Sequence, residues 1–188
     1  MTRRIQSRLA RALLASAAVL AAVPIVLSAI EEPEDELKAA IVLSFLRYGE
    51  WSQPPAGNAP LTVGVFGRGS FAEVLKRTVE NKPVNQRSVR VLELKSPAEA
   101  QGCQVVYFAS DRAMDIRPAV QAAFAGRALT IGESNDFLSQ GGAVNLLVVD
   151  GHMSFEVSLP ALERSGVNIS SKLLRFGQIR SAKKGDRS

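Results

Sequence analysis

Residues 61–94, LTVGVFGRGSFAEVLKRTVENKPVNQRSVRVLEL, decide the fold. The stretch begins with an apolar run at Leu61–Phe66 and passes through a glycine turn into Phe71–Val79, where apolar residues recur at helical spacing. It ends in a second apolar run at Val89–Leu94. The pattern predicts a strand, a helix and a strand in that order. Two strands joined through a helix usually lie parallel in one sheet, so the stretch predicts the core of an α/β protein.

The alternation of strands and helices continues downstream. The expected elements are a strand, a helix and a strand at residues 104–109, 115–125 and 128–131. Two further apolar strands, at 143–149 and 153–157, flank Asp150-Gly151, a dipeptide typical of tight hairpins. We therefore expect a three-layer α/β sandwich, with a mainly parallel sheet flanked by helices and an antiparallel hairpin near the C-terminal end.

Amphipathic helices are expected at both ends of this domain. At residues 35–48, apolar side chains recur every three or four positions and form one stripe. Near the other end, Asn168 is a candidate N-cap for a helix with Ile169, Leu173, Leu174 and Phe176 on or near one face. The predicted domain covers residues 36–179, and a disordered basic tail is expected at 180–188.

The first thirty residues have the pattern of an export signal. Residues 2–11 are basic, and an unbroken apolar run at 12–30 precedes the acidic stretch 31–36. A charged start followed by an apolar segment and small residues is typical of a secretory signal peptide. The run is also just long enough to span a bilayer, so an uncleaved anchor is the alternative. Either arrangement delivers the remaining chain across the membrane, and we expect a periplasmic protein.

The charge of the chain argues against nucleic-acid binding. The 188 residues are 46% hydrophobic and 22% charged, with a formal net charge of +5 and a pI near 9.7. Four of the 23 basic residues are arginines within the first eleven positions, before any acid. The remaining 19 basic residues therefore face 18 acidic ones. A nearly neutral domain without an interior basic stripe lacks the surface that binds phosphates.

One motif imitates a cofactor site. Gly67-Arg68-Gly69-Ser70-Phe71-Ala72 follows a predicted strand and opens a predicted helix, as the dinucleotide fingerprint does. Glu93, at the end of the next strand, lies where a ribose-binding acid would be. A tight strand-to-helix turn also needs glycines, and the chain has little room for a substrate domain. We expect no cofactor, and keep an exported nucleotide- or small-ligand-binding domain as the alternative function.

The remaining chemistry-bearing residues do not form a catalytic set. His152 is the only histidine and Cys103 the only cysteine, too few for the usual structural zinc site or for an internal disulfide. Cys103 stands at the start of a strongly apolar strand, where a free cysteine usually serves as a small buried hydrophobe. We therefore expect neither a metal site nor an enzyme.

Several segments, taken in order, carry a family resemblance. They are LKAA through FLRY to EW at 37–51, CQVVY at 103–107, ALTIGE at 128–133, FLSQGGAVN at 137–145, and FEVSL with Ala161, residues 166–169 and SSKLL between 155 and 174. This ordered set resembles the YfiR-type periplasmic repressor family over nearly the whole exported part. The better-known members carry paired cysteines, of which only the position of Cys103 is matched here. Redox control through internal disulfides is therefore not expected.

The resemblance implies a regulatory role. A YfiR-type protein would bind the periplasmic sensor domain of an inner-membrane diguanylate cyclase, a GGDEF protein, and hold it inactive. Cyclic di-GMP and biofilm formation would then fall. A sensor kinase in place of the cyclase is an alternative partner, and the sequence leaves open whether the chain forms a homodimer.

The match is strongest at the C-terminal end, where we expect both the partner surface and its support. The predicted partner-binding residues are Glu156, Arg164, Lys172 and Arg175. The predicted structural residues are Phe155, Leu159, Ile169, Leu173 and Leu174. Leu173 and Leu174 are expected to be buried against the sheet.

Overall fold

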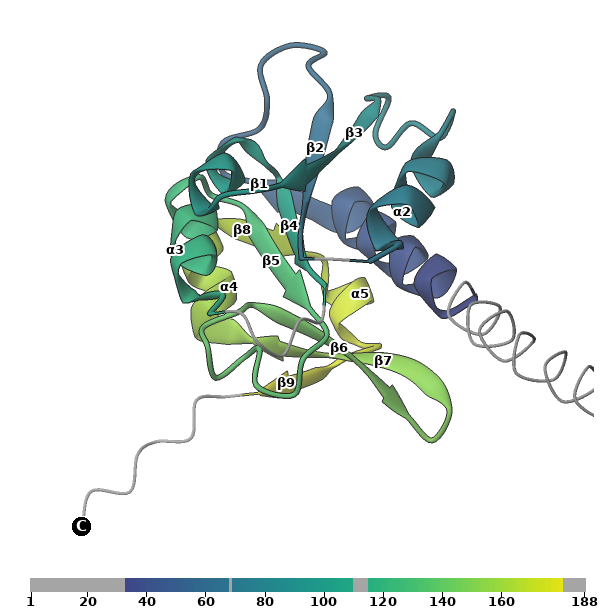
Figure 1. Ribbon diagram of the computed structural model, residues 1–188, viewed down its shortest axis with the longest axis vertical. Coiled ribbons are helices and arrows are strands. Elements are labelled where there is room, and N and C mark those ends of the chain that lie inside the picture. Colours follow the sequence, from purple (N-terminus) through teal and green to yellow (C-terminus); the bar gives the residue numbers. More distant parts are fainter. Residues whose placement is uncertain (1–32, 68, 110–114, 181–188) are drawn as a thin grey trace, which may run out of the picture. The chain divides into compact units, whose positions relative to one another are not determined.

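The computed structural model describes residues 33–67, 69–109 and 115–180 (Figure 1). Both sheets lie within the unit formed by residues 36–188. The predicted export signal at 1–30 and residues 181–188 of the predicted tail lie outside the described residues. Within the described ranges, no helix is long and apolar enough to cross a membrane.

A seven-stranded sheet forms the middle layer (Figure 1). Its order is β3-β2-β4-β5-β6-β7-β9. The bounds are β2 Leu61–Phe66, β3 Val89–Leu94, β4 Val105–Phe108, β5 Leu129–Gly132, β6 Val144–Val149, β7 His152–Ser158 and β9 Gln178–Arg180. Neighbours from β3 through β6 are parallel, β6 and β7 are antiparallel, and β9 is parallel to β7. The predicted α/β architecture, mainly parallel with a C-terminal hairpin, is confirmed.

Helices cover both faces of the sheet. They are the helix at 33–48, α2 Phe71–Val79, the 3-10 helix η1 Pro97–Gly102, α3 Arg117–Ala125, α4 Leu159–Ser165 and α5 Ser171–Leu174. On one face, the ring of Phe45 packs edge-on against Phe155 at 5.2 Å, and Phe71 from α2 stacks on Tyr107 at 4.0 Å. On the other face, η1 packs against α3, and α3 against β5. The three predicted layers are therefore present.

The hairpin has the turn that its sequence predicts. Asp150 and Gly151 both have positive φ, 50° and 77°, as a two-residue turn matching the strand twist requires. β5 pairs with β6 only at Ile131 and Gly132, and β9 pairs with β7 only at residues 156–158. Residues 146–155 therefore extend beyond both neighbouring strands. We call them the hairpin arm; Figure 1 shows its tip projecting from the sheet.

The predicted start of the last helix is wrong. Asn168 lies in β8 Val167–Ile169, which pairs antiparallel with β1 Gly49–Trp51 in a separate two-stranded sheet. Strand pairing and the burial of Ile169 keep this segment extended. The N-cap is Ser170, whose hydroxyl accepts a hydrogen bond from the backbone N–H of Lys172 at 3.3 Å. The helix that follows, α5, has only four residues.

Three other C-terminal expectations need correction. The tail does not start at residue 180, because Arg180 is the last residue of β9. Leu173 and Leu174 pack against the core but are only partly buried, since α5 lies on its margin. Phe176 follows the short helix and is 72% exposed. Among the other predicted structural residues, Phe155 and Ile169 are buried and Leu159 is half-buried.

Candidate functional site

The glycine turn after β2 lies where the sheet reverses its winding order. From β2 the chain goes to β3 on one side, and then across to β4 on the other. Gly67 and Gly69 have φ values of +127° and +125°, which side-chain-bearing residues rarely adopt. A Cβ at Gly67 would also lie 3.0 Å from the carbonyl oxygen of Ala109. The backbone conformation of the turn therefore accounts for both glycines without a ligand.

Glu93 is held in an ion pair on the surface. Lys76 Nζ, from α2, lies 2.8 Å from Glu93 Oε1 and 2.7 Å from Glu73 Oε1. The hydrogen bond from Lys76 lowers the pKa of Glu93, and the bonds to Glu73 and Glu93 raise the pKa of Lys76. The carboxylate predicted for a ribose thus has a partner on the helix that follows the glycine turn.

Cys103 is buried, as predicted. Its side chain is 1% exposed, and the thiol donates to the carbonyl oxygen of Glu99 at 3.7 Å. Burial raises the pKa of the thiol to about 11. A thiol with such a high pKa stays protonated at neutral pH and is a poor nucleophile and metal ligand. Cys103 therefore packs as a hydrophobe between the end of η1 and the start of β4.

A polar cluster that no sequence motif indicated lies at the carboxyl end of β5. Glu133 Oε2 accepts a hydrogen bond from the hydroxyl of Tyr107 at 3.0 Å, and Lys38 Nζ lies 2.6 Å from the same oxygen. The Lys38 and Glu133 side chains are only 12% and 16% exposed, and Tyr107 is fully buried. The cluster joins the helix at 33–48 to β4 and β5. A glutamate directly after a buried strand was the local hint.

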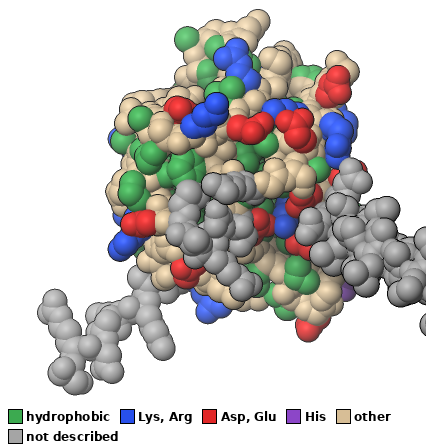
Figure 2. All heavy atoms as spheres, viewed as in Figure 1, with side chains coloured by type: hydrophobic (Ala, Val, Ile, Leu, Met, Phe, Trp, Pro, Cys, Tyr) green, Lys and Arg blue, Asp and Glu red, His purple; other side chains and the backbone are tan. Residues whose placement is uncertain are grey.

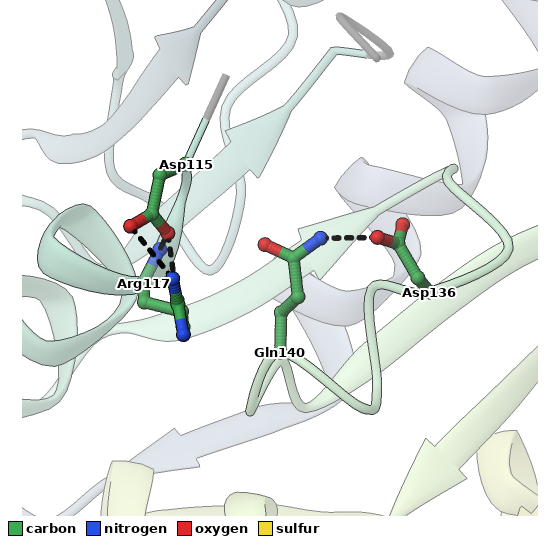
Figure 3. Close-up of polar contacts among 4 residues, drawn as sticks. All are labelled: Asp115, Arg117, Asp136 and Gln140. Atoms are coloured by element: carbon green, nitrogen blue, oxygen red, sulfur yellow. Dashed lines mark hydrogen bonds and ion pairs between the residues drawn. The ribbon is translucent and has the colours of Figure 1, made fainter. Parts of the chain in front are cut away.

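A second group of polar contacts lies on the surface near α3 (Figure 3). Arg117 Nε donates to Asp115 Oδ1 at 2.8 Å; Arg117 is the first residue of α3, and Asp115 lies just before the helix. Gln140 donates to Asp136 within the turn that follows β5. Hydrogen bonds from Ser134 and from Gln140 lower the pKa of Asp136. In each pair the two residues are close in sequence, so each pair stabilises its own local turn. In the part of the chain that the structure describes, no group of three acidic, histidine or cysteine residues could hold a metal ion.

The four predicted partner-binding residues do not form one cluster. Glu156 pairs with Arg180, and Arg180 Nε donates to Glu156 Oε1 at 3.0 Å, which ties β9 to β7. The guanidinium of Arg164 lies 4.9 Å from the centre of the Phe124 ring, and so links α4 to α3. Lys172 and Arg175 are exposed on and after α5, and neither forms an ion pair within the described ranges.

Charges of both signs are mixed on the surface. On the face drawn in Figure 2, basic and acidic side chains lie interspersed, with apolar side chains between them. That view has no continuous basic stripe, in keeping with the near-neutral charge of residues 30–188.

Comparison with known proteins adds the family. The YfiR/HmsC-like family model matches residues 35–178, which include all the described strands except the last two residues of β9. The chain belongs to the YfiR/HmsC-like family. The family is regulatory rather than catalytic, and it associates this YfiR/HmsC-like chain with the control of cyclic di-GMP signalling.

Solved structures add little to this. A conserved domain protein from Vibrio cholerae O1 biovar eltor is similar with a TM-score of 0.48 and 14% identity, over 64% of this chain. The chain spans about half, 54%, of that protein's structure. No curated protein matches the sequence.

Proposed function

We propose that this YfiR/HmsC-like protein is a periplasmic repressor without enzymatic activity. It binds the periplasmic sensor domain of an inner-membrane diguanylate cyclase and lowers cyclic di-GMP and biofilm formation. The family match over residues 35–178 carries the proposal. The basic segment and apolar run at residues 2–30, typical of an export signal, support the location.

We assign the docking surface to the C-terminal surface, defined as Lys172, Arg175, Phe176 and Ile179. Phe176 and Ile179 are 72% and 52% exposed. Lys172 and Arg175, which precede them in the chain, have no acidic partner in the described part of the chain. An exposed aromatic residue next to cations is typical of protein interfaces, where the ring supplies affinity and the charges set orientation. The surface fits an apolar segment of the partner with acidic residues at its sides.

The other two predicted residues would act indirectly. Glu156 holds β9, which carries Ile179, through its ion pair with Arg180. Arg164 is engaged with Phe124, so its substitution would first disturb the packing of α4 on α3. We therefore give both residues a supporting role.

Repression follows from differential binding. A soluble domain shifts a receptor toward its inactive state only by the difference in its affinity for the two states. Each tenfold difference corresponds to about 1.4 kcal/mol. Suppose that half of the cyclase molecules are active without the repressor. To reduce the active fraction to about one in a hundred, the repressor must bind the inactive state about 2.7 kcal/mol more tightly, a difference that a few interface contacts can supply.

The proposal is tested in cells. Deleting the gene should raise cyclic di-GMP, and restoring the parent chain should lower it again. The double variant Arg175→Glu, Phe176→Asp should not restore repression, although both residues are exposed and the melting temperature should change little. Arg90→Glu is the matched control, because Arg90 is an exposed cation on β3, at the opposite edge of the sheet.

Three results would count against parts of this proposal. An unchanged level of cyclic di-GMP after deletion would exclude a cyclase as the partner and favour a sensor kinase. Equal loss of repression by Arg90→Glu and by the double variant would remove the C-terminal surface. A rise in melting temperature with added dinucleotide would instead favour the alternative, ligand binding at the turn after β2.

A further inference from the structure

β3 forms one edge of the main sheet, and no described strand lies on its outer side (Figure 1). Its neighbour on the inner side is β2, in parallel register. The N–H of Leu61 in β2 donates to the carbonyl oxygen of Ser88 at 2.9 Å, which fixes the pattern of the ladder. In a parallel pair, every second residue of a strand directs its N–H and C=O groups to the neighbouring strand.

The outward backbone groups of β3 have no partner in the described part of the chain. By this pattern, Arg90 bonds to β2 through both of its backbone groups, whereas the N–H and C=O groups of Val89 and Val91 point away from β2. No hydrogen bond between described residues engages these outward groups. They form a short free backbone edge, onto which an extended segment can add as a further strand.

A cavity of about 460 Å³ lies beside this edge, between β3 and the end of α2. Its volume falls within the range of ~300–1,000 Å³ that is usual for ligand-binding cavities. Val89 and Val91 line it from β3, and Val79 and Pro83 line it from the other side. In an added strand, the residues opposite Val89 and Val91 would point to the same face of the sheet and enter this cavity. The remaining lining residues are Lys76, Glu80, Asn81, Lys82 and Ser88.

The charges of β3 differ between its two faces. On the face of the cavity, Glu93 is already paired with Lys76 at 2.8 Å. On the other face, Arg90 is exposed and forms no ion pair with a described residue. Leu92, on the same face as Arg90, is 41% exposed. Opposite charges directly across two strands are stabilising, so the residue that faces Arg90 in an added strand should be acidic.

We propose that β3 binds an extended segment of a partner protein as an additional strand. The segment has an acidic residue opposite Arg90, between two apolar residues opposite Val89 and Val91. Its backbone pairs with the outward groups of β3, its apolar side chains enter the cavity, and its carboxylate pairs with Arg90. So short an interface buries less than the ~1,200 Å² of standard complexes, and we expect a dissociation constant of about 0.1–1 mM.

This site is separate from the C-terminal surface. β3 and β9 lie at opposite edges of the sheet, so a segment bound to β3 leaves β9 free. The inference therefore does not rest on the cyclase as partner.

Amide hydrogen exchange of the purified protein, followed by NMR, tests the proposal. The probe is the peptide Thr-Val-Asp-Val-Thr, blocked at both ends. Without peptide, the outward N–H groups of Val89 and Val91 should exchange rapidly, whereas the N–H of Arg90, bonded to β2, should exchange slowly. With the peptide at about ten times its dissociation constant, exchange at Val89 and Val91 should slow by about tenfold.

Two variants separate recognition from folding. Arg90→Glu changes an exposed side chain and should weaken binding of this peptide by about fivefold or more. It should instead prefer the peptide with Lys in place of Asp, a reversal that a merely structural defect would not produce. Val91→Pro removes an outward N–H that takes no part in the β2–β3 ladder, so the fold should survive while binding is lost.

Arg175→Glu is the matched control, because Arg175 is an exposed cation that follows α5 rather than lying on β3. This variant should bind the peptide like the parent. Unchanged exchange at Val89 and Val91 in the presence of peptide would overturn the proposal. So would an Arg90→Glu variant that binds both peptides like the parent. Slow exchange at Val89 and Val91 without peptide, increasing with protein concentration, would show a second copy at this edge and would also overturn it.

Discussion

Replacement of Gly69 by valine should reduce stability through the backbone alone. The φ of +125° at Gly69 is one that side-chain-bearing residues rarely adopt, yet a Cβ there would meet no atom within 4 Å. The cost is therefore conformational strain rather than collision. Strain of this kind costs about 1–3 kcal/mol, and a β-branched side chain restricts the backbone further.

This strain converts into a measurable change in melting temperature. In a domain of this size, each kcal/mol lowers the melting temperature by about 2–4 °C, so Gly69→Val should melt about 2–12 °C below the parent. Differential scanning calorimetry and a thermal scan by circular dichroism should agree on the shift.

Gly102→Val is the matched control for this prediction. Gly102 also has no atom within 4 Å of a Cβ, but its φ lies outside the positive range. This variant should melt close to the parent. The reasoning would be refuted if Gly69→Val melted like Gly102→Val. If Gly69→Val also lost binding of NAD, the result would favour a dinucleotide-binding role for this turn.

Two further substitutions test the buried polar groups. Since burial raises the pKa of Cys103 from 9.0 to about 11, the stability advantage of the parent over Cys103→Ala should be complete below pH 9 and shrink as the pH rises from 9 to about 11, as measured by urea unfolding. Lys38→Met removes a charge partner of Glu133 and should lower the free energy of unfolding by about 1–3 kcal/mol. Glu133→Gln keeps an acceptor for the Tyr107 hydroxyl and should lower it less. Equal stability of Lys38→Met and the parent would contradict this.

The elements that could be predicted are those whose pattern is local. β2, α2 and β3 have the predicted bounds, since apolar runs and periodic apolar residues are separated there by glycine and polar turns. The Asp150-Gly151 turn was predictable for the same reason, because two positive φ angles select this dipeptide. In these segments, short-range preference and tertiary packing favour the same structure.

The elements that could not be predicted depend on distant partners. β8 is three residues long and would not be extended without β1. Pairing with β1 keeps Asn168 in a strand, so this residue does not cap the helix that follows. β9 depends on β7 in the same way. The cluster of Lys38, Tyr107 and Glu133 joins three elements, and no spacing along the chain relates them. Predicting the partner surface was harder still, because an exposed charge has the same local pattern whether or not a partner contacts it.

The small β1–β8 sheet sets the order in which the domain can fold. Gly49 pairs with Ile169, so strands 120 residues apart in the chain must meet before this sheet can close. The entropy of closing so long a loop is lost before the pairing compensates for it, and contacts of this kind slow folding. A nascent chain contains β1 long before β8 has been synthesised. β1 therefore waits without its partner strand for most of the synthesis of this domain, and the domain completes its fold late.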